Sequence, residues 1–320
     1  MAIVVENMYS MEGFKRFVAQ ADRVRGFKDS DTGLVLTRNL TAVDPRIFLK
    51  LYPELTFVNS GITVDNSGGY VRRIQSLRVR EQGKFATSGD FASDKGKISL
   101  AGEDSFLPVV EREAHSRWSD TEIREAELQN INIVSKMVEA HAHIYQREID
   151  EIGLLGIPDE STSVGLLNYG FTSVGSAAIS TLTVQQAYDV IADLINAQWS
   201  AVNNTPGYMA NKVMLPINVI NTLKKSIISV TASKTAFTAL KENFPEVEFM
   251  ASYRCNSVSG TSVCAAFSNS DQVMKMRIPE PLVIGEIIKQ NSFDYRVDSK
   301  YRIGGLDVLE PSGGYLLTGL

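Results

Sequence analysis

The sequence is poor in the residues and motifs that carry most enzyme chemistry. Its 320 residues include three histidines and two cysteines, and cysteine pairs at zinc-binding spacing are absent. No GxGxxG, GxSxG or HExxH pattern occurs. The two Gly-Lys pairs, Gly83-Lys84 and Gly96-Lys97, are followed by Phe and Ile, where a phosphate-binding loop requires Ser or Thr. The sequence therefore predicts no catalytic residue, no metal ligand and no cofactor, and we do not expect an enzyme.

The three histidines, His115, His141 and His143, do not have the pattern of a metal site. His141 and His143 are two residues apart in an expected helix, where they point about 200° away from each other. Glu139 and His143 lie one turn apart, but helical carboxylate sites need Glu-x-x-His from two helices. We interpret His141 as a residue that helps to fill the apolar stripe of its helix.

Long apolar runs and an excess of positive charge are also missing. No apolar run approaches the roughly 20 residues that cross a bilayer. A net charge of -5 and a pI near 5.4 argue against a general nucleic-acid binder, which would be basic. The first residues lack the basic and apolar regions of a signal peptide. With 44% hydrophobic and 22% charged residues, the composition is typical of a soluble protein made and kept in a cytoplasm, without membrane contact.

The two cysteines flank an expected hairpin turn. Cys255 and Cys264 lie on either side of Ser259 and Gly260, so they could face each other and form a disulfide. The reducing compartment favours free thiols instead. We expect two free structural thiols.

What the sequence does contain is one long stretch, Ser119 to Gly153, without proline or internal glycine. At about 1.5 Å per residue it predicts a single helix of order 50 Å over 119–152. Ser119 and Glu122 have capping-box spacing, and Gly153 is the expected stop. Apolar residues recur at threes and fours on one face: Ile123, Ile131, Val134, Val138, Tyr145, Ile149 and Ile152. A second apolar set lies on another face: Ile133, Met137 and Ile144. We therefore expect the helix to be covered from two sides.

A second informative stretch is a basic hairpin. Two strand-like runs are separated by a long polar, glycine-containing tip, and seven basic residues oppose three acidic ones between Tyr70 and Lys97. The runs carry too few apolar residues to pack both faces in a core, and a projecting hairpin needs a partner. The alternative is a solvated surface flap. We predict inter-subunit contacts for its basic residues: Arg72, Arg73, Arg78, Arg80, Lys84, Lys95 and Lys97.

The remaining sequence divides into an extended arm and a compact mixed unit. Residues 1 to about 60 contain apolar residues without a settled period, so this arm must lie along the body or along a neighbouring subunit. After residue 180, helices and strands alternate. A helix with Thr183 as its cap comes first, and a strand, turn and helix follow around Pro216. A short capped helix stopped by Pro245 then precedes a β-rich end.

Several local strings, in this order and spacing, resemble the major capsid proteins of tailed bacteriophages. The strings are LTAVDPRIFLKLYPELTF, IGLLGIPDESTSVGLLNYG, LPINVINTLKK and YRIGGLDVLEPSGGYLLTGL, and the resemblance covers most of residues 40 to 320. It implies an α+β protein with the Hong Kong 97-type capsid fold, whose C-terminal strands rejoin a peripheral sheet. The implied parts are an N-terminal arm (1–66), an extended β-hairpin loop (67–107), a peripheral domain (108–180 and 276–320) with a spine helix (119–152), and an axial α/β domain (181–275).

The resemblance implies a mechanical function. Copies of the chain would assemble into hexamers and pentamers of an icosahedral shell that encloses double-stranded DNA without reading its sequence. The arginines of the hairpin would meet acidic surfaces of the adjacent subunit. The shell would belong to a virion assembled in the host cytoplasm, with scaffold, portal and decoration proteins as further partners. Some members form a Lys–Asn cross-link in the loop, but no acceptor Asn or catalytic Glu can be matched to Lys84, Lys95 or Lys97, so we do not predict it.

Two alternatives remain open at this stage. An encapsulin-type shell shares the fold but encloses cargo enzymes, and neighbouring genes would separate it from a phage capsid. An α/β enzyme with an unrecognised site would instead form a small oligomer with a pocket of perturbed titratable groups.

Overall fold

The structure is a computed structural model that describes residues 54–86, 96–128, 132–174, 182–229, 234–258 and 260–319. The chain divides into two units, Met1–Lys50 with Glu125–Ile131, and Leu51–Arg124 with Asn132–Leu320. Most of the expected arm lies outside the described residues. Apart from the end of one helix, the elements described below belong to the second unit.

The centre of the second unit is a five-stranded mixed sheet. Its order is β5 (Thr172–Ser173), β16 (Gly314–Thr318), β10 (Val263–Phe267), β6 (Lys212–Pro216) and β9 (Glu248–Ser252). Successive side chains of a strand point to opposite faces, so β10 contributes to two cores. Ala265 and Phe267 belong to one core, and Cys264 and Ala266 to the other.

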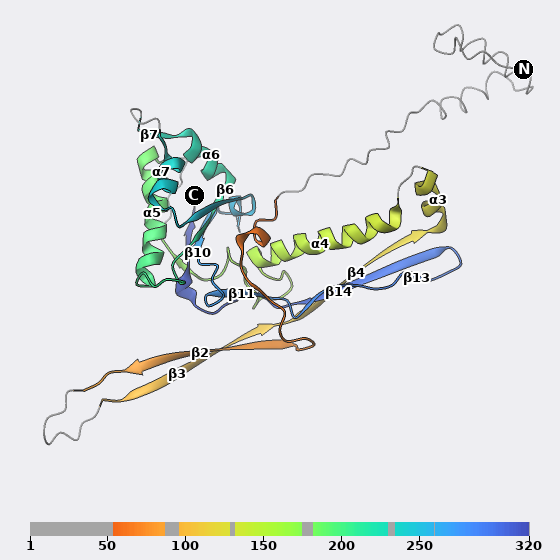
Figure 1. Cartoon of the computed structure of the whole chain (residues 1–320), viewed down its shortest axis with the longest axis horizontal. Coiled ribbons are helices and arrows are strands. Elements are labelled where there is room, and N and C mark those ends of the chain that lie inside the picture. The colour runs from red at the N-terminus through yellow and green to blue at the C-terminus, as the bar shows by residue number, and fades with distance from the viewer. Residues whose placement is uncertain are drawn as a thin grey trace, which may run out of the picture. The chain divides into compact units, whose positions relative to one another are not determined.

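Three helices bury the second of these cores, and Figure 1 shows them grouped beside β6 and β10. They are α5 (Val184–Ala201), α6 (Ile217–Lys225) and α7 (Ala236–Asn243). As predicted, Thr183 caps α5, and Pro216 ends β6 at the start of α6. The cap is a capping box that Thr183 forms with Gln186. Thr235 caps α7, which stops before Pro245. The short pair β7 (Ile227–Ser229) and β8 (Lys234–Thr235) connects α6 and α7.

The first core also packs against two smaller sheets. One contains β12 (Glu280–Ile284), β14 (Asp294–Ile303) and β13 (Ile288–Lys289), and β4 (Val110–Ser119) pairs with β14 from Val110↔Ile303 to Ser119↔Asp294. The other has the order β1 (Val64–Asp65), β11 (Met274–Arg277) and β15 (Gly305–Val308). Single-turn 3-10 helices lie at Val58–Ser60 (η1), Arg254–Asn256 (η3) and Pro311–Gly313 (η4). The chain is therefore an α+β protein.

The C-terminal strands do not all rejoin one peripheral sheet. β14 pairs with β4, as expected for that sheet, but β16 pairs with β10 in the five-stranded sheet. The prediction is therefore wrong for β16. The physical reason is the alternation of side chains along β16. Leu316 points into the first core, while Tyr315 and Leu317 point into the second, so pairing with β10 completes both cores.

The prediction of one helix over 119–152 is wrong. The structure has α3 (Asp120–Leu128) and α4 (Ile133–Leu155). The capping box at the start is confirmed, because Glu122 N donates to Ser119 Oγ at 3.2 Å and Ser119 N to Glu122 Oε2 at 2.9 Å. Asn132, however, has an extended backbone, and its Oδ1 accepts from Ser135 N at 3.1 Å. Asn is a strong N-cap residue, so a second helix begins there.

Gly153 is not the helix stop either. α4 continues to Leu155, and Gly156, with φ 86°, follows its end. A Cβ at Gly153 would lie 2.4 Å from the ring of Phe57, so the glycine allows this buried ring to pack against the helix. The apolar faces of α4 are also covered unequally. Ile152 is buried, whereas Ile144 is 51% exposed, so the expected two-sided cover is incomplete within one subunit.

Candidate interaction surface

The expected hairpin is present as a two-stranded ribbon (Figure 1). β2 (Arg73–Gly83) and β3 (Ile98–Pro108) pair antiparallel from Arg73↔Pro108 to Gly83↔Ile98. The tip residues 87–95 lie outside the described residues, and the predicted contact residue Lys95 is among them. We call this pair of strands the ribbon.

One face of the ribbon is apolar and exposed from root to tip. Residues opposite each other in an antiparallel pair share a face, so the register puts five large apolar side chains on one side. These are Leu77 (65% exposed), Val79 (53%), Ile98 (58%), Leu100 (70%) and Phe106 (57%). We call this side the apolar face, although it also carries Arg73, Gln75, Glu81 and Asp104. Exposed apolar side chains in a row mark an interaction site in a soluble protein.

The other face, which we call the root face, anchors the ribbon to its own subunit. Ser76 is buried, and its Oγ donates to Asp307 Oδ2 at 2.7 Å. The guanidinium of Arg78 donates to the carbonyl of Val308. Both partners lie in β15, so the part of the root face around Ser76 and Arg78 packs on the three-stranded sheet. The apolar face is exposed along the whole ribbon.

Asp307 is a junction for three other elements. It is 3% exposed, and Oδ2 also accepts from Arg277 Nε at 3.0 Å. Arg277 pairs in turn with Asp65 of β1. One buried carboxylate therefore connects the ribbon, through Ser76, with β11 and β1. A charge this well buried depends on its partners, because an unpaired buried charge is costly.

The predicted basic contact residues are not arranged in one row. Arg73 lies on the apolar face, whereas Arg78 and Arg80 lie on the root face. Arg72 precedes β2, and its carbonyl accepts from Val109 N at 3.0 Å. Lys84 and Lys97 are both exposed and lie near the tip. The side chain of Arg78 is engaged within the subunit, while Arg72, Arg73 and Arg80 are exposed.

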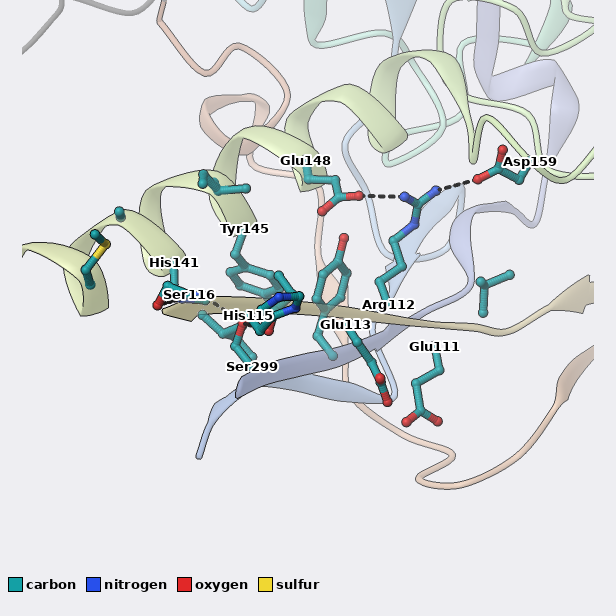
Figure 2. Close-up of a pocket in the computed structure, with 17 residues that line it drawn as sticks. Glu111, Arg112, Glu113, His115, Ser116, His141, Tyr145, Glu148, Asp159 and Ser299 are labelled. Carbon is teal, nitrogen blue, oxygen red and sulfur yellow. Dashed lines mark hydrogen bonds and ion pairs between the residues drawn. The ribbon is translucent and has the colours of Figure 1, made fainter. Parts of the chain in front are cut away.

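A groove of about 440 Å³ lies between α4 and the strands β4 and β14 (Figure 2). Its wall includes the apolar side chains of Met137, Ile144 and Leu282. Acidic side chains also line it: Glu111, Glu113, Glu148 and Asp159. Arg112 is held between two of them, with Nη1 2.7 Å from Glu148 and Nη2 3.5 Å from Asp159. The groove is not among the predictions from the sequence, because these do not include β4. A signal for this strand is present, since Glu111 and Glu113 alternate with Arg112 in the period of two that strands have.

The floor of the groove is polar and buried. His141 does not simply fill an apolar stripe, because its Nε2 lies 2.9 Å from Ser116 Oγ and its Nδ1 2.7 Å from Ser299 Oγ. Tyr145 and Tyr301 meet edge to face, with ring centroids 4.9 Å apart. Burial raises the pKa of both phenols, and the Glu148 carboxylate raises that of Tyr301 further. The tyrosines therefore remain neutral hydroxyls.

The end of α4 fixes the segment that leads out of the N-terminal arm. Asp150 is 1% exposed, and its Oδ1 accepts from Phe57 N at 2.6 Å, while Arg254 lies 3.9 Å from Oδ2. Burial raises the pKa of Asp150, although the backbone N–H groups of Phe57 and Val58 oppose the shift.

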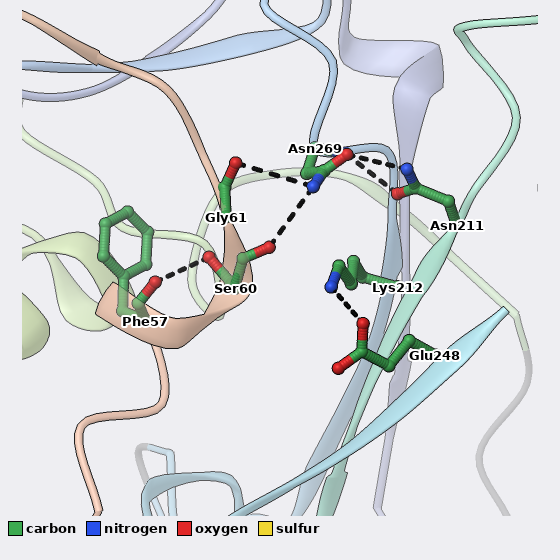
Figure 3. A network of polar contacts seen from close by, with 7 residues as sticks. All are labelled: Phe57, Ser60, Gly61, Asn211, Lys212, Glu248 and Asn269. Atoms are coloured by element: carbon green, nitrogen blue, oxygen red, sulfur yellow. Dashed lines mark hydrogen bonds and ion pairs between the residues drawn. The ribbon is translucent and has the colours of Figure 1, made fainter.

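A polar network holds the same segment from its other side, as Figure 3 shows. Asn269 Nδ2 donates to the carbonyls of Ser60, at 3.4 Å, and Gly61, at 3.5 Å. Asn211 Nδ2 in turn donates to Asn269 Oδ1 at 2.7 Å. The start of the described chain is therefore fastened to α4 on one side and to the loops beside β6 and β10 on the other.

Asp150 gives a pH-dependent prediction. Its folded pKa is raised above the ordinary 3.8, so its contribution to stability is fully present below that value and is lost as the pH rises through the folded pKa. We expect Asp150→Asn to remove this decline, while Asp150→Ala leaves the Phe57 N–H unpaired and costs about 1–3 kcal/mol. Urea unfolding from about pH 4 to pH 7 measures both effects. Equal pH dependence in the wild type and Asp150→Asn would contradict the prediction.

The two cysteines are buried thiols. Cys255 and Cys264 are free and buried, and burial raises the pKa of Cys255 to about 12 and that of Cys264 well above its ordinary value. Both therefore remain unreactive thiols. Within the described ranges, no three His, Cys, Asp or Glu residues are placed to hold a metal ion. None of the described helices combines the length and apolar character needed to cross a bilayer.

An anchored ribbon with one uncovered apolar face, an apolar groove with acidic walls and a fastened arm segment are features of a structural subunit that associates with other chains. The model of the major capsid protein family matches residues 86–319. The capsid of Myoviridae phage XM1 shares 40% sequence identity, with a TM-score of 0.80, and the match covers 88% of this chain and 98% of that one. A search of the curated proteins found no match.

More distant structures share the fold. The capsid of a native GTA particle is 12% identical with a TM-score of 0.65, and the match covers 87% of this chain and 95% of that one. A structure from Mycobacterium phage Ogopogo is also 12% identical, with a TM-score of 0.63, and the match covers 89% of this chain and 98% of that one.

The chain belongs to the major capsid protein family. It is a major capsid protein of a tailed phage, a structural component of the virion, and the encapsulin and enzyme alternatives are set aside.

Proposed function

We propose that this chain forms hexamers and pentamers of an icosahedral shell with the Hong Kong 97-type fold, and that the shell encloses double-stranded DNA without sequence readout. The observation that carries the proposal is the ribbon: its root is fastened to its own subunit, and its other face is exposed along its whole length. Such a ribbon suits heterologous contacts, in which different surfaces of successive copies meet and close into rings.

The proposed parts follow the resemblance, with one change. Residues 1–66 are the arm, 67–107 the extended loop, and 108–180 with 276–320, except for β5 and β16, the peripheral domain. We extend the axial domain, 181–275, by β5 and β16, because both strands belong to its sheet. The spine helix of the peripheral domain is α4, preceded by the separate helix α3. The proposed partners are scaffold, portal and decoration proteins, and assembly takes place in the host cytoplasm.

Negative-stain electron microscopy with light scattering tests the proposal. We expect closed shells, tubes, or rings of five and six subunits from the concentrated protein or after addition of its scaffold. A small oligomer that remains small with scaffold and crowding agents present would contradict the proposal.

The basic residues of the hairpin give a second test. We propose that Arg72, Arg73, Arg80, Lys84, Lys95 and Lys97 meet acidic surfaces of the adjacent subunit, while Arg78 acts within its own subunit as an anchor of the root face. The triple substitution of Arg72, Arg73 and Arg80 by Ser should change the free energy of unfolding by no more than about 0.5 kcal/mol.

The same triple variant should lose shells at a lower salt concentration than the wild type, because exposed charge pairs are screened by salt. Differential scanning calorimetry measures subunit stability, and light scattering across a salt series measures assembly. The matched Arg→Lys triple variant keeps the charge and should assemble more fully than the Ser variant. If shells of the Ser variant persisted to the same salt concentration as wild-type shells, the proposed role of these arginines in inter-subunit contacts would be refuted.

A further inference from the structure

β4 is an edge strand, and its outer edge faces away from the sheet. Within the described ranges, β4 pairs with β14 on one side and with no strand on the other. Asp120 N donates to Phe293 O at 2.8 Å, which continues the register of the β4–β14 pair. Because bonded positions alternate in an antiparallel pair, the even-numbered residues of β4 bond to β14. The N–H and C=O groups of the odd-numbered residues therefore point to the outer edge.

The subunit itself closes only the two ends of this outer edge. At one end, Val109 N donates to the carbonyl of Arg72 at 3.0 Å. At the other end, Ser119 N donates to Glu122 Oε2 at 2.9 Å. Both donors are odd-numbered residues, as the direction of the outer edge requires.

Between these ends the edge is open. The main-chain N–H and C=O groups of Glu113, His115 and Arg117 have no hydrogen-bond partner among the described residues, and all three residues are exposed. The groove beside α4 opens along the same strand, because all residues from Val110 to Ser116 line it. An open edge of this kind is a template on which another strand pairs.

The side chains of the outer edge are self-complementary when two copies of β4 run antiparallel. With His115 opposite His115 of the second copy, Glu113 lies opposite Arg117 of that copy. An isologous contact forms this pair twice. Glu113 has no ion pair among the described residues, and Arg117 has an exposed one, 3.6 Å from Asp294. Both side chains are therefore available to a second copy.

The same charges disfavour other alignments. A parallel pair in matching register would place Glu113 opposite Glu113, and like charges directly opposite each other are destabilising. The adjacent antiparallel register would place Glu111 opposite Arg117. It gains less, because Glu111 already pairs with Lys300 and Arg302 of its own subunit. The charges therefore select the register centred on His115.

We propose that β4 of one subunit pairs antiparallel with β4 of a second copy about a two-fold axis, so that two four-stranded sheets become one continuous sheet. The inference rests on the proposed shell, because an icosahedral shell has two-fold axes at which isologous contacts form. Main-chain hydrogen bonds of Glu113, His115 and Arg117 supply the affinity, and the Glu113–Arg117 pairs fix the register.

Disulfide trapping with a single substitution tests the contact. His115→Cys should give a disulfide-linked dimer, and no longer ladder, on a non-reducing gel after mild oxidation of the concentrated protein. The Cα atoms of bonded, directly opposed residues lie about 5.5 Å apart, which a disulfide spans. The matched control is Asp298→Cys, because Asp298 lies opposite His115 on β14, one strand further from the axis. It should give no dimer above the wild type, and the buried Cys255 and Cys264 do not compete.

A proline tests the main chain of the edge. His115→Pro removes an N–H that points away from β14, and proline is tolerated at such edge positions, so the subunit should keep a cooperative unfolding transition in calorimetry. Sedimentation of the concentrated protein should show association weakened by about tenfold or more. His115→Ala keeps the N–H and should change association by less than about twofold.

Reversal of the charges tests the register. Glu113→Arg and Arg117→Glu should each weaken association, and the two substitutions combined in one chain should restore it, because the pair between copies is then re-formed. A double variant no better than the single ones would contradict the register.

The outcomes separate this inference from the proposed function. Shells of the wild type without a dimer from His115→Cys, or with undiminished association of His115→Pro, would overturn the strand pairing and leave the shell intact as a proposal. Dimers of equal yield from the Asp298→Cys control would also overturn it. A chain that stays monomeric at every concentration and with scaffold would contradict the proposed function as well.

Discussion

Gly165→Ala is expected to destabilise the subunit by about 3 kcal/mol or more, although it adds a single methyl group. A Cβ at Gly165 would lie 2.3 Å from the carbonyl carbon of Leu154 and from the amide nitrogen of Leu155. These are backbone atoms at the end of α4, so no side-chain rotation can relieve the contact. Two backbone hydrogen bonds hold the segments together here, from Leu166 N to Gly153 O and from Leu167 N to Leu154 O, each 2.9 Å long.

The same segment contains a matched control for this substitution. A Cβ at Gly170 would have no heavy atom within 4 Å, and its φ is not positive. Gly170→Ala should therefore change the free energy of unfolding by less than about 0.5 kcal/mol. Urea denaturation of both variants measures the difference. If the two variants had the same midpoint, the close approach of residues 154 and 165 would not constrain the fold as the structure indicates.

Asp307→Ala should cost about 3 kcal/mol, because it removes a buried carboxylate from Arg277, which then keeps only its ion pair with Asp65. Arg277 is only 13% exposed, so water compensates little of this loss. Ser76 also loses its acceptor at the root of the ribbon. Asp307→Asn keeps an acceptor oxygen and should cost less than the alanine substitution. We further expect the amides of β2 to exchange faster with solvent, since the ribbon loses its anchor.

Urea denaturation measures the stability of these variants, and hydrogen exchange measures the anchoring of β2. Asp294→Ala is the matched control, because its carboxylate is 38% exposed and lies 3.6 Å from Arg117 in a surface ion pair. Such a pair contributes about 0–1 kcal/mol. A cost for Asp307→Ala no greater than that of the control would show that the carboxylate does not connect these elements.

Features set by neighbouring residues could be predicted from the sequence. The capping box at Ser119, the cap at Thr183 and the turn at Pro216 are confirmed, because each depends on residues within about one turn of helix. The hairpin was also correct, since both of its strands and their tip lie in one continuous segment. The family resemblance rested on strings of the same local kind.

Features set by distant residues were missed or misread. β4 was not predicted, because its partner β14 lies far away in the sequence and pairs, for example, His115 with Asp298. The sequence predicts a helix stop at Gly153, because nothing near it in the sequence shows that the ring of Phe57 occupies the space of a side chain. The start of a new helix at Ile133 is set locally by the cap at Asn132, but this cap lies within an otherwise continuous apolar pattern that predicts one helix.

By itself, the sequence determined that this protein has no recognisable catalytic motif, has a basic hairpin and follows the order of parts of a phage capsid protein. These properties reside in residue types and short spacings. Only the tertiary structure decided which face of the hairpin is available to a partner and which groove in the subunit is uncovered. The physical reason is that the contacts of Ser76 and Arg78 with β15 select one of two alternating faces, and such long-range contacts leave no local pattern in the sequence.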